Sequence, residues 1–463
     1  MCGIVGYTGY EAAAPILLAG LKKLEYRGYD SAGIAVRDPQ RQDVAVVKSP
    51  GRLLNLIRKT DNGASVPGTC GIGHTRWATH GEPTETNAHP HRSADDDVVG
   101  VHNGIIENYQ ELKEKLVRKG YVFRSETDTE VAVDLVDYYY KKYKLGPVDA
   151  IAKAMVRIRG SYALALMFRD LPGEIWVARK DSPMIIGITE DASFVASDVP
   201  AILSYTRQVY YIDNLEMGRL TPGQAVFYNL DGDEVQKQST EITWDAEAAE
   251  KGGFEHFMLK EIHEQPKAVR DTLNSLIHEG KIDLSAAGVS DELLKAVSSF
   301  CIVACGSAWH VGMAAQYVVE ELAQLPVRVE LGSEFRYRPL LLDQDALVIV
   351  ISQSGETADS LAALRVAKER GARTLAIVNV VGSTIAREAD SVLYTLAGPE
   401  IAVATTKAYS AQLAAMDALA VQFGRARGCL DDGEYARCIG ELEALPAKMA
   451  RVLEDKERSE EHT

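Results

Sequence analysis

From residue 298 to about residue 427, apolar runs of strand length alternate with segments of helical periodicity. Helical segments such as WHVGMAAQYVVEELAQ separate the strands, and most of these strands are apolar along nearly their whole length. Such strands are buried on both faces, as in a parallel sheet covered by helices. The pattern predicts a doubly wound α/β domain with ligands at the carboxyl ends of its strands. The segments that read as strands are SSFCIVACG, VRVELGS, ALVIVIS, RTLAIVNV and SVLYTLA.

The first half of the chain mixes strands and helices without strict alternation, which favours an α+β sandwich of sheets faced by helices. Residues 239–295 are charged and lack strand runs, so we expect a linker followed by helices. The expected strands are 4–9, 32–36, 43–48, 98–104, 162–168, 174–179, 185–189 and 193–197, and the expected helices are 15–26, 107–120 and 129–143. The expected domains are 2–230, a linker with connecting helices over 231–295, the α/β domain over 296–430, and a further connection over 431–463.

Charge and cysteine content exclude several classes of protein. The formal net charge is −16, whereas nucleic-acid binding depends on basic surface that displaces counterions. No apolar run is long enough to cross a bilayer. The six cysteines show no zinc-ribbon or redox spacing, and thiols so sparse in a large chain indicate a reduced, cytoplasmic protein.

Cys2 stands directly after the initiator methionine and opens the apolar run Gly-Ile-Val-Gly. A signal peptide needs a basic start, but the first lysine is Lys22, so we expect this segment to stay with the protein. Cys2 is then either a buried strand thiol or a nucleophile whose own α-amino group serves as its base. The residue alone leaves both interpretations open.

Three further stretches carry groups suited to an amino-acid amide. In GHTRWATHG (73–81), an exposed loop Arg76 suits a carboxylate and Trp77 could cover a ligand; the alternative is a surface turn. In HNGIIEN (102–108), Asn103 beside the Gly104 N–H makes a two-donor oxyanion hole, or only a hairpin turn. In SETDTEV (125–131), an N-cap explains Ser125 or Thr127, and Asp128 is left to bind an ammonium group.

A fourth stretch, SQSGET (352–357), follows the strand ALVIVI and precedes a helix. Its hydroxyls and backbone N–H groups at a helix N-terminus form an anion site, although a serine-rich capped turn is the alternative. The turn CGSAW (305–309) ends a neighbouring strand, and two such turns facing one crevice favour a phosphate.

Together, MCGIVG, LEYRGYDSAG, GHTRWATHGEP, NAHPH, HNGIIEN and SETDTE resemble the class II glutamine amidotransferases of the N-terminal-nucleophile hydrolase fold. ISQSGETADS and GPEIAVATTKAYSAQL resemble the first sugar-isomerase (SIS) domain of the glutamine–fructose-6-phosphate aminotransferase family. The resemblance covers the chain to about residue 455 and implies a four-layer αββα sandwich followed by a doubly wound SIS domain. It implies an enzyme that forms D-glucosamine 6-phosphate and L-glutamate from D-fructose 6-phosphate and L-glutamine, with no cofactor or metal and with a homodimer as the full-length form.

The resemblance also assigns residues. Cys2, after removal of Met1, would attack the glutamine δ-carbonyl, and Asn103 and Gly104 would hold the oxyanion. Arg76 would bind the α-carboxylate and Asp128 the α-ammonium group. The loop over the substrate would consist of Trp77, Thr79 and His80. The sugar phosphate would contact Ser307, Ser352, Gln353, Ser354, Thr357 and Val403.

Two departures from the family pattern stand out. The first turn reads CGSAWH where the family has CGTSYH, so Ala308 receives no side-chain role. No second SQSGET-like turn appears, and we expect the glutamate base, the ring-opening histidine and the Schiff-base lysine in a second SIS domain that is missing here. We therefore expect glutamate and ammonia from this chain but no amino sugar. The alternatives are another class II amidotransferase, or a non-catalytic sugar-phosphate sensor.

Overall fold

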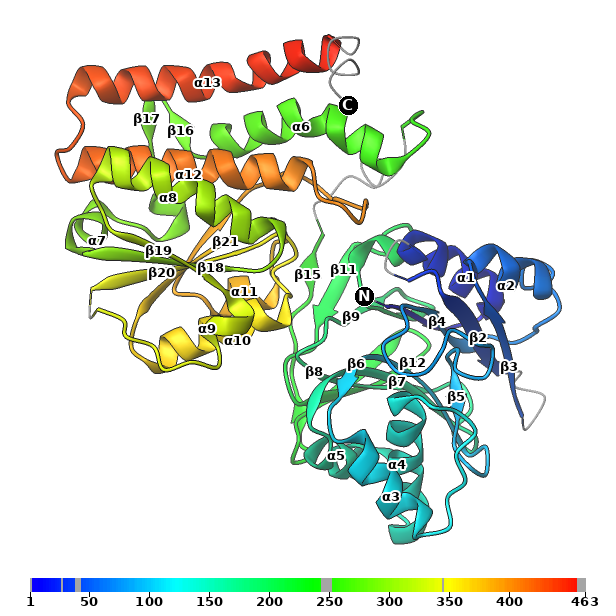
Figure 1. Cartoon of the computed structure of the whole chain (residues 1–463). Coiled ribbons are helices and arrows are strands. Elements are labelled where there is room, and N and C mark those ends of the chain that lie inside the picture. The colour runs from blue at the N-terminus through cyan, green and yellow to red at the C-terminus, as the bar shows by residue number, and fades with distance from the viewer. Residues whose placement is uncertain (1, 26–27, 38–42, 243–251, 344, 456–463) are drawn as a thin grey trace. The chain divides into compact units, whose positions relative to one another are not determined.

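In a computed structural model, the chain forms two compact units, Met1–Ala246 and Glu247–Thr463 (Figure 1). The structure describes every residue except 1, 26–27, 38–42, 243–251, 344 and 456–463. Four of the expected features therefore lie wholly or partly outside the described residues. They are Met1, the last residue of the helix expected over 15–26, residues 243–251 of the expected linker, and the end of the chain. Among the helices that the structure describes, none is long and apolar enough to cross a membrane.

The first unit contains two large sheets, and within its described residues the first of them has eight strands. Their order is β15-β11-β9-β10-β1-β4-β2-β3. The pairings of β1 with β4 and of β4 with β2 are antiparallel. The bounds are β1 (Gly3–Thr8), β2 (Ser31–Arg37), β3 (Val44–Pro50), β4 (Cys70–Arg76), β9 (Ile185–Ile188), β10 (Ser193–Ala196), β11 (Gln208–Tyr211) and β15 (Thr240–Glu241).

The second sheet of this unit runs in the order β14-β13-β12-β8-β7-β6-β5. Its bounds are β5 (His91–Arg92), β6 (Val98–Ile106), β7 (Gly160–Phe168), β8 (Ile175–Lys180), β12 (Glu216–Thr221), β13 (Gln224–Tyr228) and β14 (Glu234–Val235). The helices of the unit are α1 (Ala13–Leu24), α2 (Leu53–Lys59), α3 (Tyr109–Val117), α4 (Asp128–Tyr143) and α5 (Pro147–Arg157), with a 3-10 turn at Val199–Ala201.

Three apolar cores separate the layers of this unit. One packs Leu17 and Leu21 of α1 on Ile34 of the first sheet, and another packs α3, α4 and α5 on the second sheet. The third, here called the middle core, joins the two sheets through residues such as Ile72 of β4 and Val101 of β6. Helix, sheet, sheet and helix therefore stack in that order, and the expected four-layer αββα sandwich is confirmed.

The second unit is built on a parallel sheet with the strand order β19-β18-β20-β21-β22. Its strands are β18 (Ser299–Ala304), β19 (Val327–Leu331), β20 (Ala346–Ser352), β21 (Arg373–Val378) and β22 (Ser391–Tyr394). One face packs on α8 (Ser307–Ala323) and α12 (Lys407–Ala426), and the other on α9 (Gly332–Phe335), α10 (Ala358–Glu369) and α11 (Thr384–Glu388) (Figure 1). The doubly wound α/β prediction is confirmed.

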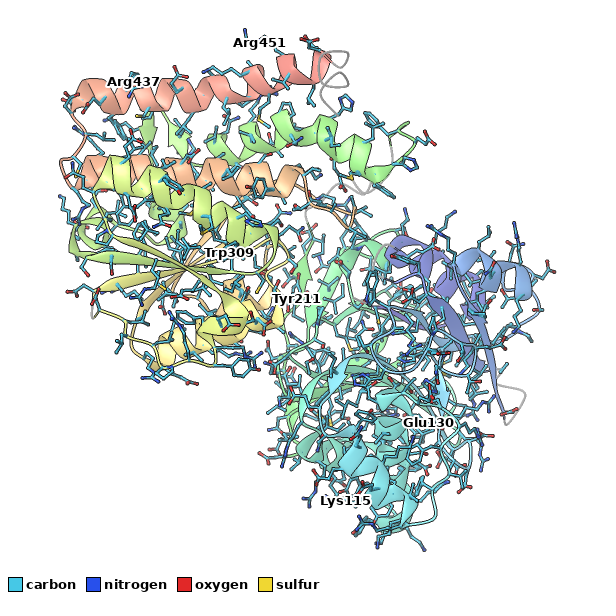
Figure 2. The ribbon with its side chains drawn as sticks, in the orientation of Figure 1. Lys115, Glu130, Tyr211, Trp309, Arg437 and Arg451 are labelled. Atoms are coloured by element: carbon cyan, nitrogen blue, oxygen red, sulfur yellow. The ribbon has the colours of Figure 1, made fainter. Side chains whose placement is uncertain are left out.

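The remaining elements of this unit extend the layer around α12. Helices α6 (Phe257–Asn274) and α13 (Asp432–Glu454) run beside α12, and the short α7 (Asp291–Ala296) and the hairpin of β16 (Ile277–His278) and β17 (Lys281–Ile282) complete the unit (Figure 1). Apolar side chains of α6, α8, α12 and α13 share one core with the sheet. Trp309, labelled in Figure 2, packs against this core from α8.

Candidate active site

Cys2 lies directly before β1, at the end of the first sheet where its neighbour β4 finishes. The backbone N–H of Trp77 donates a hydrogen bond to Sγ of Cys2 across 3.2 Å. Burial raises the pKa of the Cys2 thiol, while the hydrogen bond from Trp77 and the charge of Arg76 act in the opposite direction. The thiol therefore depends on its neighbours and on a base to become a thiolate, because the thiolate is the reactive form.

Asn103 comes from the second sheet and meets Cys2 at this point. Its Nδ2 donates to the backbone oxygen of Cys2 at 3.0 Å, and its Oδ1 lies 3.0 Å from Nε2 of His74. Asn103 and Gly104 were expected at the end of a strand, but β6 continues through them to Ile106. Gly104 has φ of +127°, and a Cβ there would lie 2.1 Å from the oxygen of Ser161. Only glycine fits this position beside β7.

Arg76 does not lie in an exposed loop, and that expectation was wrong. It is the last residue of β4 and is only 3% exposed, because β4 pairs with both β1 and β2. Its guanidinium donates to the backbone oxygens of His80, Gly81 and Glu82. The guanidinium thus holds the following loop in this conformation.

Asp128 opens α4 after Thr127, whose side chain accepts a hydrogen bond from the N–H of Glu130 and caps the helix. The Asp128 carboxylate is 4% exposed, and its Oδ2 accepts a hydrogen bond from the N–H of Ile106 at 2.9 Å. Nδ1 of His80 lies 4.0 Å from Oδ1. The charge of Asp128 raises the pKa of Cys2, so the carboxylate acts within the same site as the thiol.

The loop that follows β4 contains the other predicted glutamine contacts. Trp77 is 40% exposed and packs edge-to-face on Tyr29 with 5.4 Å between the ring centroids. The hydroxyl of Thr79 lies 3.4 Å from Nδ1 of His80, whose ring packs edge-to-face on Tyr109. The loop therefore places one aromatic side chain in solvent beside the thiol, where a ligand could be covered.

The predicted sugar-phosphate residues gather at the carboxyl ends of two paired parallel strands. Ala304 of β18 is opposite Ile351 of β20, so the turns that follow emerge at the same edge of the sheet. Ser307 is the first residue of α8. The segment from Ser352 to Thr357, which includes Gln353 and Ser354, connects β20 to α10.

Hydrogen bonds within the second turn fix its shape. Ser352 Oγ accepts from the N–H of Gly355 at 3.1 Å and lies 3.1 Å from the hydroxyl of Thr357. Ser354 Oγ accepts from the N–H of Glu356 at 3.2 Å. The turn therefore presents hydroxyls ahead of the N-terminus of a twelve-residue helix, an arrangement that favours an anion.

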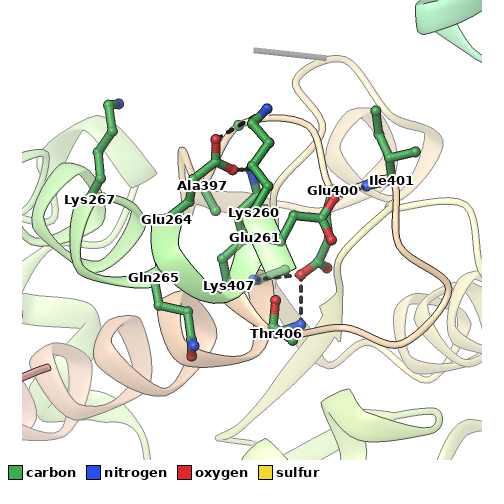
Figure 3. A network of polar contacts seen from close by, with 12 residues as sticks. Lys260, Glu261, Glu264, Gln265, Lys267, Ala397, Glu400, Ile401, Thr406 and Lys407 are labelled. Carbon is green, nitrogen blue, oxygen red and sulfur yellow. Dashed lines mark hydrogen bonds and ion pairs between the residues drawn. The ribbon is translucent and has the colours of Figure 1, made fainter. Parts of the chain in front are cut away.

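The loop between β22 and α12 carries Val403, which is 72% exposed. A polar network holds this loop against α6 (Figure 3). Glu261 of α6 accepts hydrogen bonds from the N–H groups of Ile401 and Ala402. Glu264, one turn further along α6, accepts from Nζ of Lys407 at 2.7 Å. The middle of the loop and the first residue of α12 are therefore both bound to α6.

Each of the two units matches a known protein family. Residues 74–204 match the family model described as Glutamine amidotransferase domain, and residues 293–422 match the one described as SIS domain. The glutamine–fructose-6-phosphate aminotransferase (isomerizing) of Clostridium acetobutylicum is 51% identical over 459 residues, which are 99% of this chain and 74% of that protein. The protein of the same name from Thermus thermophilus is 48% identical over 456 residues, 98% of this chain and 74% of its own. Among solved structures, the C-terminal domain of glucosamine-fructose-6-phosphate aminotransferase from Francisella tularensis matches at 40% identity and a TM-score of 0.42, covering 43% of this chain and 56% of that one.

Proposed function

The chain belongs to the glutamine–fructose-6-phosphate aminotransferase family, and from that premise we propose that Cys2 hydrolyses L-glutamine to supply ammonia for D-fructose 6-phosphate. The family reaction yields D-glucosamine 6-phosphate and L-glutamate. The observation that most supports the glutaminase step is the hydrogen bond from the side-chain amide of Asn103 to the backbone oxygen of Cys2. The two residues come from different sheets, and this contact brings a hydrogen-bond donor to the residue that carries the thiol.

The chemistry follows from these groups. Cys2, once its α-amino group is free, gives its thiol proton to that group and attacks the δ-carbonyl of glutamine. The carbonyl oxygen becomes an oxyanion, which N–H groups of Asn103 and Gly104 stabilise. The C–N bond breaks, the α-amino group returns the proton to the leaving ammonia, and a thioester remains. Water then cleaves the thioester and releases glutamate.

Charged groups at the two ends of the substrate would orient it. Asp128 is the carboxylate suited to the α-ammonium group, and Arg76 is the guanidinium suited to the α-carboxylate. Arg76 now donates to backbone oxygens of the loop. A substrate carboxylate would replace these oxygens, because a charged acceptor binds a guanidinium more strongly than a neutral one does. Trp77, Thr79 and His80 would then cover the substrate and exclude water from the thioester until ammonia has left.

The second unit would hold the sugar phosphate. The hydroxyls of Ser352 and Thr357 stand at the start of α10, where the positive end of the helix dipole attracts an anion. Ser307 begins the neighbouring helix, and Val403 is exposed on the loop beside α12. A homodimer and a cytoplasmic location, both implied by the family, belong to the same proposal.

Glutamate release by matched cysteine variants tests the proposal. Cys2→Ala should lose glutaminase activity by several powers of ten, whereas Cys438→Ala, which also removes a thiol, should retain it. Circular dichroism and thermal melting show whether both variants fold. A Cys2→Ala protein that releases glutamate at the normal rate would refute the proposal. A folded parent chain that binds fructose 6-phosphate but releases no glutamate would instead favour a sugar-phosphate sensor.

A further inference from the structure

The side-chain amide of Asn103 is held at both of its ends by the opposite sheet. Nδ2 donates to the backbone oxygen of Cys2, and Oδ1 lies 3.0 Å from Nε2 of His74. Cys2 precedes β1, and His74 lies on β4, where it is directly opposite Ile4 of β1. The proposed nucleophile therefore comes directly before β1, and the histidine that contacts the amide lies on the adjacent strand β4.

These two contacts fix which way the amide points. The backbone oxygen of Cys2 can only accept a hydrogen bond, so the group of Asn103 that faces it at 3.0 Å must be the NH₂ group. The reverse orientation would place two acceptor oxygens against each other. Oδ1 must then face His74, and Nε2 of His74 must carry the hydrogen that bonds to it.

The surroundings of His74 agree with a neutral ring protonated on Nε2. The side chain is fully buried, and its ring stacks on His89 with 4.1 Å between the centroids. Nδ1 has no hydrogen-bond partner among the described residues. Burying an unprotonated ring nitrogen without a partner costs less free energy than burying an N–H group without one. Burial lowers the pKa of His74 to about 3, so the ring stays neutral over the pH range in which enzymes usually work.

We propose that His74 is a positioning residue for glutamine hydrolysis, in that its Nε2–H holds Oδ1 of Asn103 and so aims the amide at the oxyanion. This inference rests on the proposed glutaminase function. An asparagine amide rotates easily about its last bond, and a single hydrogen bond does not define its plane. With both ends bound, one N–H is used by Cys2 and the direction of the second N–H is fixed. Donors oriented before the reaction stabilise an oxyanion without reorganising.

Two substitutions at His74 separate the hydrogen bond from packing. In His74→Gln, the side-chain NH₂ reaches about the position of Nε2 and can donate, whereas His74→Leu fills similar space without a donor. We expect His74→Leu to lower kcat for glutamate release by about 100-fold, as loss of one oxyanion donor does, with KM within about threefold. His74→Gln should keep kcat within about tenfold of the parent chain. The control is His89→Phe, which keeps the ring stack and leaves the Asn103 contact in place.

A double-mutant cycle shows whether His74 acts through Asn103. Once Asn103→Ala has removed the amide, adding His74→Leu should lower kcat no further. A normal kcat in His74→Leu, or a full additional loss in the double variant, would overturn the inference. If His74→Leu does not fold, His74→Asn replaces it, because its shorter amide stops near Nδ1 and should lose activity while His74→Gln keeps it. Equal rates in that pair would also overturn the inference, whereas a parent chain without glutaminase activity would refute the proposed function itself.

Discussion

The backbone N–H of Trp77 donates a hydrogen bond to the Sγ of Cys2, so the first residue of the loop after β4 contacts the proposed nucleophile directly. A thiolate accepts such a bond more strongly than a thiol does. The position of the loop and the protonation of Cys2 are therefore linked. Arg76 strengthens this link in two ways. Its positive charge lowers the pKa of the thiol, and its guanidinium binds the backbone oxygens of the same loop.

Blocking the N-terminus should abolish glutamine hydrolysis while leaving the fold intact. The α-amino group of Cys2 is the proposed base, and retention of Met1 converts that amine into an amide without basicity. We expect the rate of glutamate release to fall by several powers of ten. The same extension placed at the C-terminus is the control, and the intact mass of each protein establishes its first residue. A Met1-retaining protein with near-normal activity would exclude this base.

Asp128→Asn should remove the preference for substrates with an α-ammonium group. The asparagine oxygen can still accept the hydrogen bond from Ile106, so the substitution removes mainly the charge. Loss of a buried charged contact costs about 2–5 kcal/mol, which corresponds to a fall of at least about 30-fold in kcat/KM for glutamine. The measurement compares glutamine with the analogue that lacks the amino group. Undiminished discrimination by the variant would show that another group binds the ammonium.

Thr357→Val should weaken binding of fructose 6-phosphate by about 10- to 100-fold. The change removes a hydroxyl that lies 3.1 Å from Ser352 Oγ at the start of α10, and hydrogen bonds to charged groups are worth about 1.5–3 kcal/mol. Calorimetry with fructose 6-phosphate, and separately with inorganic phosphate, measures the effect. Ser285→Ala, on an exposed turn of the same unit, is the control. Unchanged affinity would place the phosphate elsewhere.

Glu261→Ala should destabilise the second unit and weaken its sugar-phosphate affinity together. It leaves the buried N–H of Ile401 without its partner, a loss of about 1–3 kcal/mol, and releases the loop that carries Val403. Glu261→Gln retains one acceptor oxygen and should lose less. Lys267→Ala, on an exposed part of the same helix (Figure 3), serves as the control. Urea unfolding and calorimetry give the two quantities, and a change in neither would mean that the network does not hold the loop.

Asp134→Asn should stabilise the first unit at pH 8 more than at pH 5. Asp134 lies on α4 near Glu130, the residue that Figure 2 labels on this helix. Its side chain is fully buried, and this burial raises its pKa to about 8. Between an unfolded pKa near 4 and this value, the folded chain keeps a proton that the unfolded chain has lost, so stability falls as the pH rises.

Asparagine has no such proton, and it keeps an oxygen to accept from the N–H of Ala94. We expect a gain of about 2 kcal/mol or more at pH 8, from urea unfolding at both pH values. Asp231→Asn, an exposed aspartate, should show no pH-dependent difference from the parent chain. An equal gain at pH 5 and pH 8 would mean that the carboxyl is already ionised when buried.

The sequence predicted the second unit more completely than the first. The strands of its parallel sheet are mostly continuous apolar runs, and the long helices α8, α10 and α12 are visible in their own residues. Helix α13 was missed, because its residues were expected to form a connection over 431–463. In the first unit, β4 reads as a glycine-bounded loop because Gly71 and Gly73 interrupt its apolar pattern, and only pairing with β1 and β2 makes it a strand. The short helices α2 and α5 were not predicted either.

The candidate site was predicted as a set of residue types but not as a geometry. Cys2, Arg76, Asn103 and Asp128 were identified from motifs, and the structure brings them together, although it buries Arg76. The contact between His74 and Asn103 had no signal in the sequence, because it joins two sheets across 29 positions of the chain. Only the stacking of the sheets brings the two side chains into reach.

The middle core between these sheets has a second role besides stability. Cys2 and Asn103 come from the two sheets that this core joins, so the volumes of Ile72 and Val101 help to set the gap across which the Asn103 amide reaches the backbone oxygen of Cys2. Face-to-face sheets keep a spacing of about 10 Å that depends on the side chains between them. The side chains of the middle core therefore set the spacing of the two sheets, and this spacing in turn sets the distance between Cys2 and Asn103. We expect a change of one methylene there to shift Asn103 relative to Cys2 even where the protein remains folded.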